Sequence, residues 1–237
     1  MQVKAISRAL ILGLCFSLCS CGHDFAFYIH EGDSLKEKTK FNEASQNYQL
    51  ALKEARKKKS KDELLKATLR LAQLRLIESN QEQAATLFAE AAELAAAVPS
   101  AGPACKASCL NEIAKLHLLA GRKDEGLEKL KESLQVLSEA QMEDSAAAAE
   151  TSSLLGSFYA ESGQYKLADK YLRLAVAAYQ AHPEDYGSYS RTLSALANNC
   201  RQSGKEDEAL EFDQKAKTIS VSGLSSVTGK AYAKFNQ

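Results

Sequence analysis

The sequence predicts an all-α protein built as an array of similar helical units. Good helix formers are abundant, and no segment alternates apolar and polar residues with β-branched enrichment as strands do. Five times a small residue is followed, four and seven positions later, by a usually large and then a small one. The first residues of these triplets, 44, 84, 126, 168 and 209, are 40, 42, 42 and 41 positions apart. A fixed period of this length indicates one repeated supersecondary unit. The triplets are Ala44-Tyr48-Ala51, Ala84-Phe88-Ala91, Gly126-Leu130-Ser133, Ala168-Leu172-Ala175 and Ala209-Asp213-Ala216.

The composition is that of an ordinary globular protein. Of 237 residues, 45% are hydrophobic and 25% are charged, enough for a sizeable core. Lys and Arg together number 30, as do Asp and Glu, so no basic surplus favours nucleic acid. We therefore expect no nucleic-acid partner.

The first residues do not belong to the repeat array. Lys4 and Arg8 precede an apolar run at residues 9–18, which is too short for a membrane-spanning helix of about 20 residues. This pattern predicts a signal peptide over residues 1–20. Leu18-Cys19-Ser20-Cys21 resembles a bacterial lipobox, which implies lipidation at Cys21 and a lipidated N-terminus at residues 21–24. The protein would then lie in the bacterial cell envelope, anchored to a membrane and facing away from the cytoplasm. An ordinary secretory signal, giving a secreted protein, and an uncleaved anchor are the alternatives.

Each period divides into two helical segments. In the fourth, apolar residues recur at helical spacing from Leu154 to Tyr159 and again from Tyr165 to Val176, with a Ser-Gly-Gln turn between. Gly163 lies five residues before Ala168, where a helix would end in a left-handed residue. Gly121 and Gly204 have the same position in their periods. Thr39 and Ser79 take this place in the first two periods, so we expect those turns to end differently.

Small residues near the start of each second helix indicate that the two helices of a pair pack closely. A small side chain lets two backbones approach, and the larger residue four positions later fills the space beside it. The array is expected at residues 25–221, in repeats at about 25–58, 62–98, 104–139, 146–182 and 187–221. Residues 222–237 lose the pattern and are expected to form a loose tail.

The repeats resemble the tetratricopeptide repeat (TPR). The best match is Leu154–Val176, where Leu155, Gly156, Tyr159, Gly163, Ala168 and Ala175 fall on the family pattern. Leu196–Ala216 and Phe41–Ala55, with Gly32 in the first helix, match next. The period exceeds the usual 34 or so residues, so the chain resembles the longer class found in kinesin light chains. The resemblance implies a right-handed α-solenoid of about five antiparallel helix pairs.

The same resemblance implies a protein or peptide partner, bound in a concave groove lined by the first helix of each pair. Polar side chains there could hold a peptide backbone or a carboxylate by charge-assisted hydrogen bonds; a solvated polar face is the alternative. The family's basic clamp for C-terminal carboxylates is not present at its full set of positions. The groove positions are Lys66, Arg70, Gln73, Asn111, Lys115, Ser153, Ser157, Ser194, Asn198 and Arg201.

No catalytic motif is present in the sequence. It has neither a glycine-rich phosphate loop nor a nucleophile elbow, and Cys105, Cys109 and His117 lack zinc-ligand spacing. We expect no enzyme activity, no cofactor and no metal. The spacing of Cys105 and Cys109 allows a disulfide in an oxidising compartment, and two half-buried thiols are the alternative.

The expected function is that of a membrane-anchored interaction scaffold, which binds a partner peptide or protein in its groove. One alternative is a structural or self-associating subunit of an envelope assembly. Another is a secreted TPR protein without a lipid.

Overall fold

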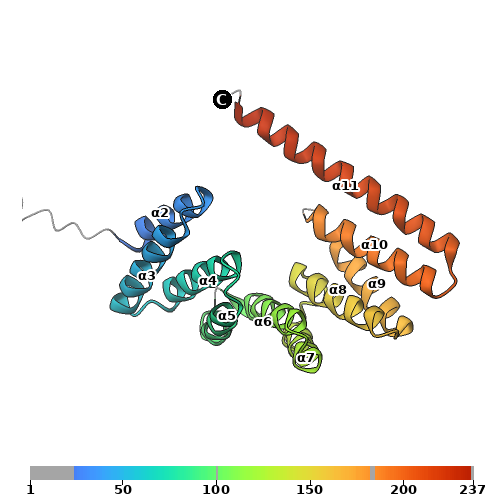
Figure 1. Ribbon diagram of the computed structural model, residues 1–237, viewed down its shortest axis with the longest axis horizontal. Helices are drawn as coiled ribbons and strands as arrows, with labels where there is room; N and C mark the ends of the chain where they lie inside the picture. The colour runs from blue at the N-terminus through green and yellow to red at the C-terminus, as the bar shows by residue number, and fades with distance from the viewer. Residues whose placement is uncertain (1–23, 100, 182–184, 236–237) are drawn as a thin grey trace, which may run out of the picture. The chain divides into compact units, whose positions relative to one another are not determined.

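Helices make up the described part of the chain, which in this computed structural model comprises residues 24–99, 101–181 and 185–235, with side chains to residue 221. No strand occurs within these residues, so the all-α prediction is confirmed. The helices, labelled in Figure 1, are α2 (Phe25–Glu37), α3 (Phe41–Lys58), α4 (Lys61–Ile77), α5 (Gln81–Ala96), α6 (Gly102–Leu119), α7 (Lys123–Glu139), α8 (Ala146–Glu161), α9 (Tyr165–Ala181), α10 (Tyr186–Gln202) and α11 (Glu206–Phe235).

The chain divides into two compact units, residues 1–74 and 75–237. In the first unit α2 packs against α3. In the second unit α6 pairs with α7, α8 with α9, and α10 with α11, and neighbouring pairs also touch. The first helices follow one another, because α6 contacts α8 and α8 contacts α10. Packed consecutive helix pairs of this kind form an α-solenoid, as predicted.

The turn inside each pair has one conformation throughout. Gly121, Gly163 and Gly204 have φ of 75°, 72° and 74°, and Thr39 and Ser79 have φ of 59°. The expectation that the first two turns end differently is therefore wrong. In all five, the left-handed residue and its successor donate backbone hydrogen bonds to the helix end, such as Gln164 N–H to Tyr159 O at 2.8 Å. This is the Schellman arrangement.

All residues of the triplets except Asp213, which is half-buried, lie in the core. Ala44, Tyr48, Ala168 and Leu172 are fully buried. A Cβ atom built on Gly156 would lie 2.5 Å from Cγ of Leu172, so these two helices leave no room for a side chain where they cross.

The end of the chain differs from expectation. Residues 222–237 were expected to form a loose tail, whereas α11 continues as a helix from Glu206 to Phe235. Loss of the repeat pattern does not prevent backbone hydrogen bonding along a helix.

Candidate functional site

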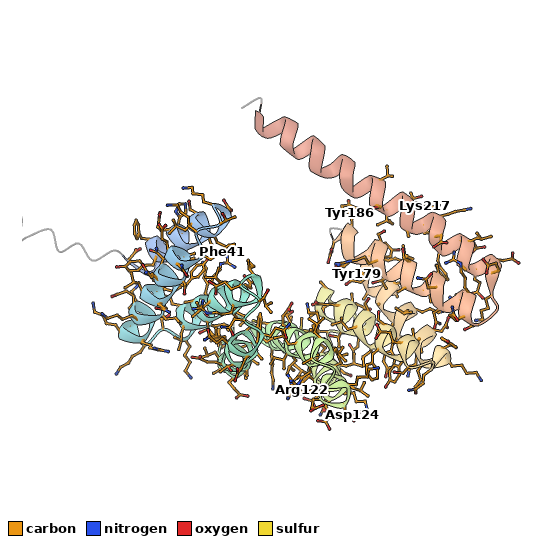
Figure 2. The ribbon with its side chains drawn as sticks, in the orientation of Figure 1. Phe41, Arg122, Asp124, Tyr179, Tyr186 and Lys217 are labelled. Atoms are coloured by element: carbon orange, nitrogen blue, oxygen red, sulfur yellow. The ribbon has the colours of Figure 1, made fainter. Side chains whose placement is uncertain are left out.

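A hollow lined mostly by polar and charged residues lies on the face that the first helices α6, α8 and α10 form in the second unit, here called the first-helix face. Its volume is about 280 Å³. Tyr179, labelled in Figure 2, reaches it from the second helix α9. The hollow is lined by Lys115, Glu150, Ser153, Leu154, Ser157, Tyr179, Ser188, Arg191 and Ala195.

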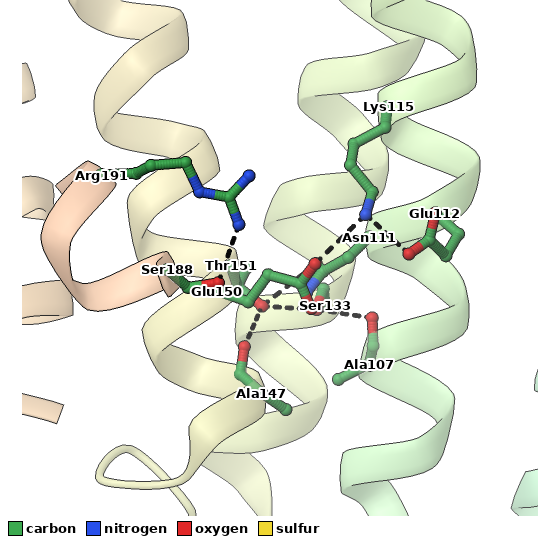
Figure 3. A network of polar contacts seen from close by, with 10 residues as sticks. All are labelled: Ala107, Asn111, Glu112, Lys115, Ser133, Ala147, Glu150, Thr151, Ser188 and Arg191. Atoms are coloured by element: carbon green, nitrogen blue, oxygen red, sulfur yellow. Dashed lines mark hydrogen bonds and ion pairs between the residues drawn. The ribbon is translucent and has the colours of Figure 1, made fainter. Parts of the chain in front are cut away.

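Glu150 of α8 stands at the centre of a charged network beside the hollow (Figure 3). Its Oε1 lies 3.2 Å from Nζ of Lys115, and its Oε2 accepts a hydrogen bond from Asn111 Nδ2 at 3.4 Å. Lys115 also donates to Glu112 at 2.6 Å. Burial alone would lower the pKa of Lys115, but the hydrogen bond to Glu112 and the two negative charges raise it above its usual value. Lys115 is therefore a fully paired cation.

A layer of buried hydrogen bonds supports this network. Thr151 Oγ1 donates to Asn111 Oδ1 at 3.1 Å and lies 3.0 Å from Ser133 Oγ. Ser133 in turn donates to the Ala107 carbonyl oxygen at 3.2 Å. Asn111 is fully buried, so its expected role as a partner contact is wrong. It joins α6 to α8 from beneath the site.

Arg191 of α10 lies on the other side of Glu150 from Lys115 (Figure 3). Its side chain is exposed and donates to Ser188 Oγ at 3.0 Å. The Ser188 backbone N–H donates to Asp185 Oδ1 at 3.1 Å, which caps α10. Within the described residues, no carboxylate lies within 4.0 Å of the Arg191 guanidinium.

Hydroxyl groups complete the hollow. Ser153 and Thr192 share a hydrogen bond of 2.8 Å, while the half-buried Ser157 has no hydrogen-bond partner among the described residues. Burial raises the pKa of Tyr179 to about 12, although a hydrogen bond with Ser188 opposes this shift. Tyr179 is buried and keeps its proton at neutral pH.

The remaining groove candidates of the second unit lie outside the hollow. Arg201 donates to Asn198 Oδ1 at 2.9 Å and forms an ion pair with Asp213 of α11. Ser194 is half-buried. Arg201 is thus occupied within its own helix pair.

The first unit holds the other three candidates. Arg70 Nε lies 3.0 Å from Asp33 Oδ1, and the Tyr48 hydroxyl donates to the same carboxylate oxygen at 2.7 Å. Lys66 and Gln73 are exposed. Arg70 is therefore paired, like Lys115 and Arg201.

Sequence reasoning missed Glu150 and Arg191. Both occupy the place of Lys66 in its repeat, since positions 66, 108, 150 and 191 are 42, 42 and 41 residues apart. The repeat register that identified Lys66 could therefore have found them.

The structure shows Cys105 and Cys109 as free thiols, the first half-buried and the second buried. Their disulfide stays a prediction. Cys200 is buried in the core. Cys21 and the expected signal peptide lie outside the described residues.

The described residues contain no cluster of three or more His, Cys, Asp or Glu side chains able to hold a metal ion. Among the helices at residues 24–235, none combines the length and apolarity needed to cross a membrane.

Comparisons with known proteins agree with this architecture. Residues 148–220 match a family model described as tetratricopeptide repeat. No curated protein sequence matches the chain. The fold is similar to that of BtubC (BKLC) from P. vanneervenii, with a TM-score of 0.67 and 22% identity over 81% of this chain and 77% of that one.

Two other folds are also similar. The nearly identical TPR-like repeats attributed to a kinesin light chain of Podosopora anserina give a TM-score of 0.61 at 16% identity, over 85% of this chain and 96% of that one. A Rap protein complexed with competence and sporulation factor gives 0.64 at 17% identity, over 83% of this chain. The match spans about half, 54%, of the Rap chain.

Proposed function

We propose that this tetratricopeptide-repeat protein is an interaction module, which binds a peptide segment of a partner protein across its first-helix face. The hollow between Lys115 and Arg191 carries the proposal. It offers one exposed guanidinium, the Ser157 hydroxyl, which has no hydrogen-bond partner among the described residues, and a volume of about 280 Å³. Pockets for whole drug-sized ligands are roughly 300–1,000 Å³, so this hollow suits a side chain of an extended peptide better.

The similar folds support a binding role. One similar structure, the Rap protein, was solved with competence and sporulation factor. Solenoid repeats offer extended surfaces, on which a ligand can touch side chains from successive repeats. Here α6, α8 and α10 each supply polar groups to one hollow. A peptide that contacts side chains from all three helices could therefore be recognised by binding alone.

Selection from a library of short random peptides tests this role. The immobilised full chain should enrich a defined set of sequences, and the affinity of one enriched peptide is then measured by fluorescence anisotropy. Ser157→Gln fills the hollow and should weaken binding at least tenfold. Ser220→Gln, at an exposed serine of α11 outside the hollow, is the matched control. Absence of enrichment, or equal affinity of both variants, would refute the proposal.

We further propose that a lipid on Cys21 holds the module to a membrane of the bacterial envelope, facing away from the cytoplasm. The support is the apolar run at residues 9–18 followed directly by Leu18-Cys19-Ser20-Cys21. Stable anchoring takes two acyl chains or one chain with a second signal. Mass spectrometry of the N-terminal peptide from expressing bacteria should find acyl mass on Cys21, and Cys21→Ala should release the protein from membranes. An unmodified mature N-terminus in the medium would support a secreted protein instead.

A further inference from the structure

We infer that a cluster of exposed cations at the junction of α3 and α4 binds the anionic headgroups of the membrane that holds the protein. This inference rests on the proposed anchoring at Cys21 and adds a second, electrostatic contact between the first unit and the same membrane. All six side chains are exposed. The cluster, here called the junction cluster, comprises Lys53, Arg56, Lys57, Lys58, Lys59 and Lys61.

The start of α2 and the end of α3 lie at the same end of the first helix pair (Figure 1). The two helices pack against each other and are joined by residues 38–40, so they run antiparallel. They cross at Gly32 and Tyr48, where a Cβ atom on the glycine would lie 2.5 Å from Cε1 of the tyrosine. Phe25 (32 − 7) and Ala55 (48 + 7) are each about 10 Å from this crossing and therefore lie level with each other.

This end of the pair is close to Cys21 along the chain. Four residue steps lead from Cys21 to Phe25 (25 − 21), and they span at most about 14 Å when fully extended. Arg56 follows Ala55 directly, and the rest of the junction cluster except Lys53 follows within six residues of Ala55. An acyl chain on Cys21 would therefore bring the junction cluster close to the membrane surface.

Positive charge is in excess at this end of the pair. Residues 53–63 contain six cations and three acids, a surplus of three (6 − 3). Residues 33–43, at the opposite end, contain three of each. Asp24, at the start of α2, reduces the surplus near the junction to two, but it leaves the difference in sign of the two ends unchanged.

Two of the acids are half-buried and pair with members of the junction cluster. Glu54 Oε2 lies 3.7 Å from Nζ of Lys57, and Glu63 Oε1 lies 3.2 Å from Nζ of Lys58. Among the described residues, no carboxylate lies within 4.0 Å of the other four cations. An anionic surface could therefore contact these four without breaking an ion pair.

Helix stability does not account for Lys59 and Lys61. Cations in the last turn of α3, residues 56–58, are favoured by the helix dipole. Lys59 follows that turn with φ of 55°, a conformation that glycine adopts more readily. Lys61 is the first residue of α4, where the dipole favours negative charge instead. These two charges therefore suit a contact outside the fold better than they suit the helices.

An anionic membrane surface is the partner that this arrangement fits. The cations follow one another along the chain and are all exposed, so they present a layer of positive charge. Such a layer is attracted by many headgroups at once within a Debye length, about 10 Å at 0.1 M ionic strength. A lipid on Cys21 would hold the layer near that range, and a basic patch is the kind of second signal that strengthens anchoring by acyl chains.

Vesicle binding by the full chain with Cys21→Ala tests the junction cluster without the lipid. Partition onto phosphatidylcholine vesicles is compared with partition onto vesicles that contain roughly one-third phosphatidylglycerol, at about 0.1 M ionic strength. The anionic vesicles should be preferred about tenfold or more, and the preference should disappear at about 1 M salt, where the Debye length is about 3 Å. Lys4 and Arg8 are present in every variant, so differences between variants report on the junction cluster.

Two triple variants in this background carry the test, and circular dichroism checks that both are folded. The first should lose most of the preference, because it removes three exposed cations that have no ion pair; it combines Arg56→Gln, Lys59→Gln and Lys61→Gln. The second removes the same charge from the opposite end of the pair and should keep the preference; it combines Lys36→Gln, Lys38→Gln and Lys40→Gln. Equal preference in the two variants, or none in the Cys21→Ala parent, would overturn the inference.

The acylated protein gives a second readout. On anionic vesicles, a water-soluble amine reagent should label Lys59 and Lys61 several-fold more slowly than on neutral vesicles, while labelling of Lys38 and Lys40 should not change. Equal labelling of Lys59 and Lys61 on both vesicles, in protein with acyl mass on Cys21, would overturn this inference and leave the anchoring standing. Absence of acyl mass on Cys21 would refute the anchoring, and the inference with it.

Discussion

Gly156 of α8 lies directly against Leu172 of α9, so that a Cβ atom on the glycine would be 2.5 Å from Cγ of the leucine. Gly32 of α2 has the same relationship to Tyr48 of α3, also at 2.5 Å. In both pairs the second residue follows the first by 16 positions, 172 − 156 and 48 − 32. The close crossing of the two helices is thus a repeated feature, set by a small residue on one helix and a large one on the other.

Gly156→Ala should destabilise the second unit by about 1–3 kcal/mol, because the added methyl group has no space without moving Leu172 or the backbone. Urea unfolding followed by circular dichroism measures this loss. Gly187→Ala is the control, since its nearest heavy atom would be Asp185 Oδ1 at 4.0 Å. That variant should be neutral or slightly stabilising. Equal stability of the two variants would show that the crossing can relax.

The helical repeat could be predicted from the sequence because packing at helix crossings requires small residues at regular spacing. Turn conformation was predicted only where glycine occupied the left-handed position. At Thr39 and Ser79 the surrounding helix pair imposes φ of 59° on residues that disfavour this conformation. The identity of these residues alone therefore does not reveal their backbone conformation.

Repeat register placed Lys115, Ser153 and Ser157 among the expected groove residues, and the structure places these three side chains around the hollow. Register could not show that Lys115 and Arg70 are already paired, because their partners Glu150 and Asp33 lie 35 and 37 positions away in the sequence. Nor could register show that Asn111 is covered by neighbouring helices.

Thr39→Gly should stabilise the first unit by roughly 0.5–1 kcal/mol. A β-branched residue in the left-handed conformation is strained by about 1–2 kcal/mol, while glycine adopts it freely at some cost in unfolded-state entropy. Ser79→Gly should give a smaller gain, since serine is not β-branched. Chemical denaturation measures both changes. Thr86→Gly, within α5, should lower stability instead, and a gain there would point to some other cause.

Asn111→Leu should lower the free energy of unfolding by about 1–3 kcal/mol, since it removes partners from the buried Thr151 hydroxyl and from Glu150. The change is similar in size and keeps the core apolar, so cavity formation contributes little. Urea denaturation reports the loss. Asn198→Leu, at an exposed position of α10, should change stability far less. A neutral result at Asn111 would mean that the network contributes nothing to stability.

Cys105 should react as a thiolate near neutral pH. The hydrogen bond from Cys109 lowers the pKa of Cys105, although partial burial opposes this shift. Alkylation by iodoacetamide, followed by peptide mass spectrometry at a series of pH values, should show that Cys105 reaches its half-maximal rate at a lower pH than Cys200. Cys109→Ala removes the donor and should move that midpoint upward. Burial raises the pKa of Cys200, so this thiol should stay slow at neutral pH and serves as the internal reference. An unchanged Cys105 midpoint in the Cys109→Ala variant would contradict the assigned cause.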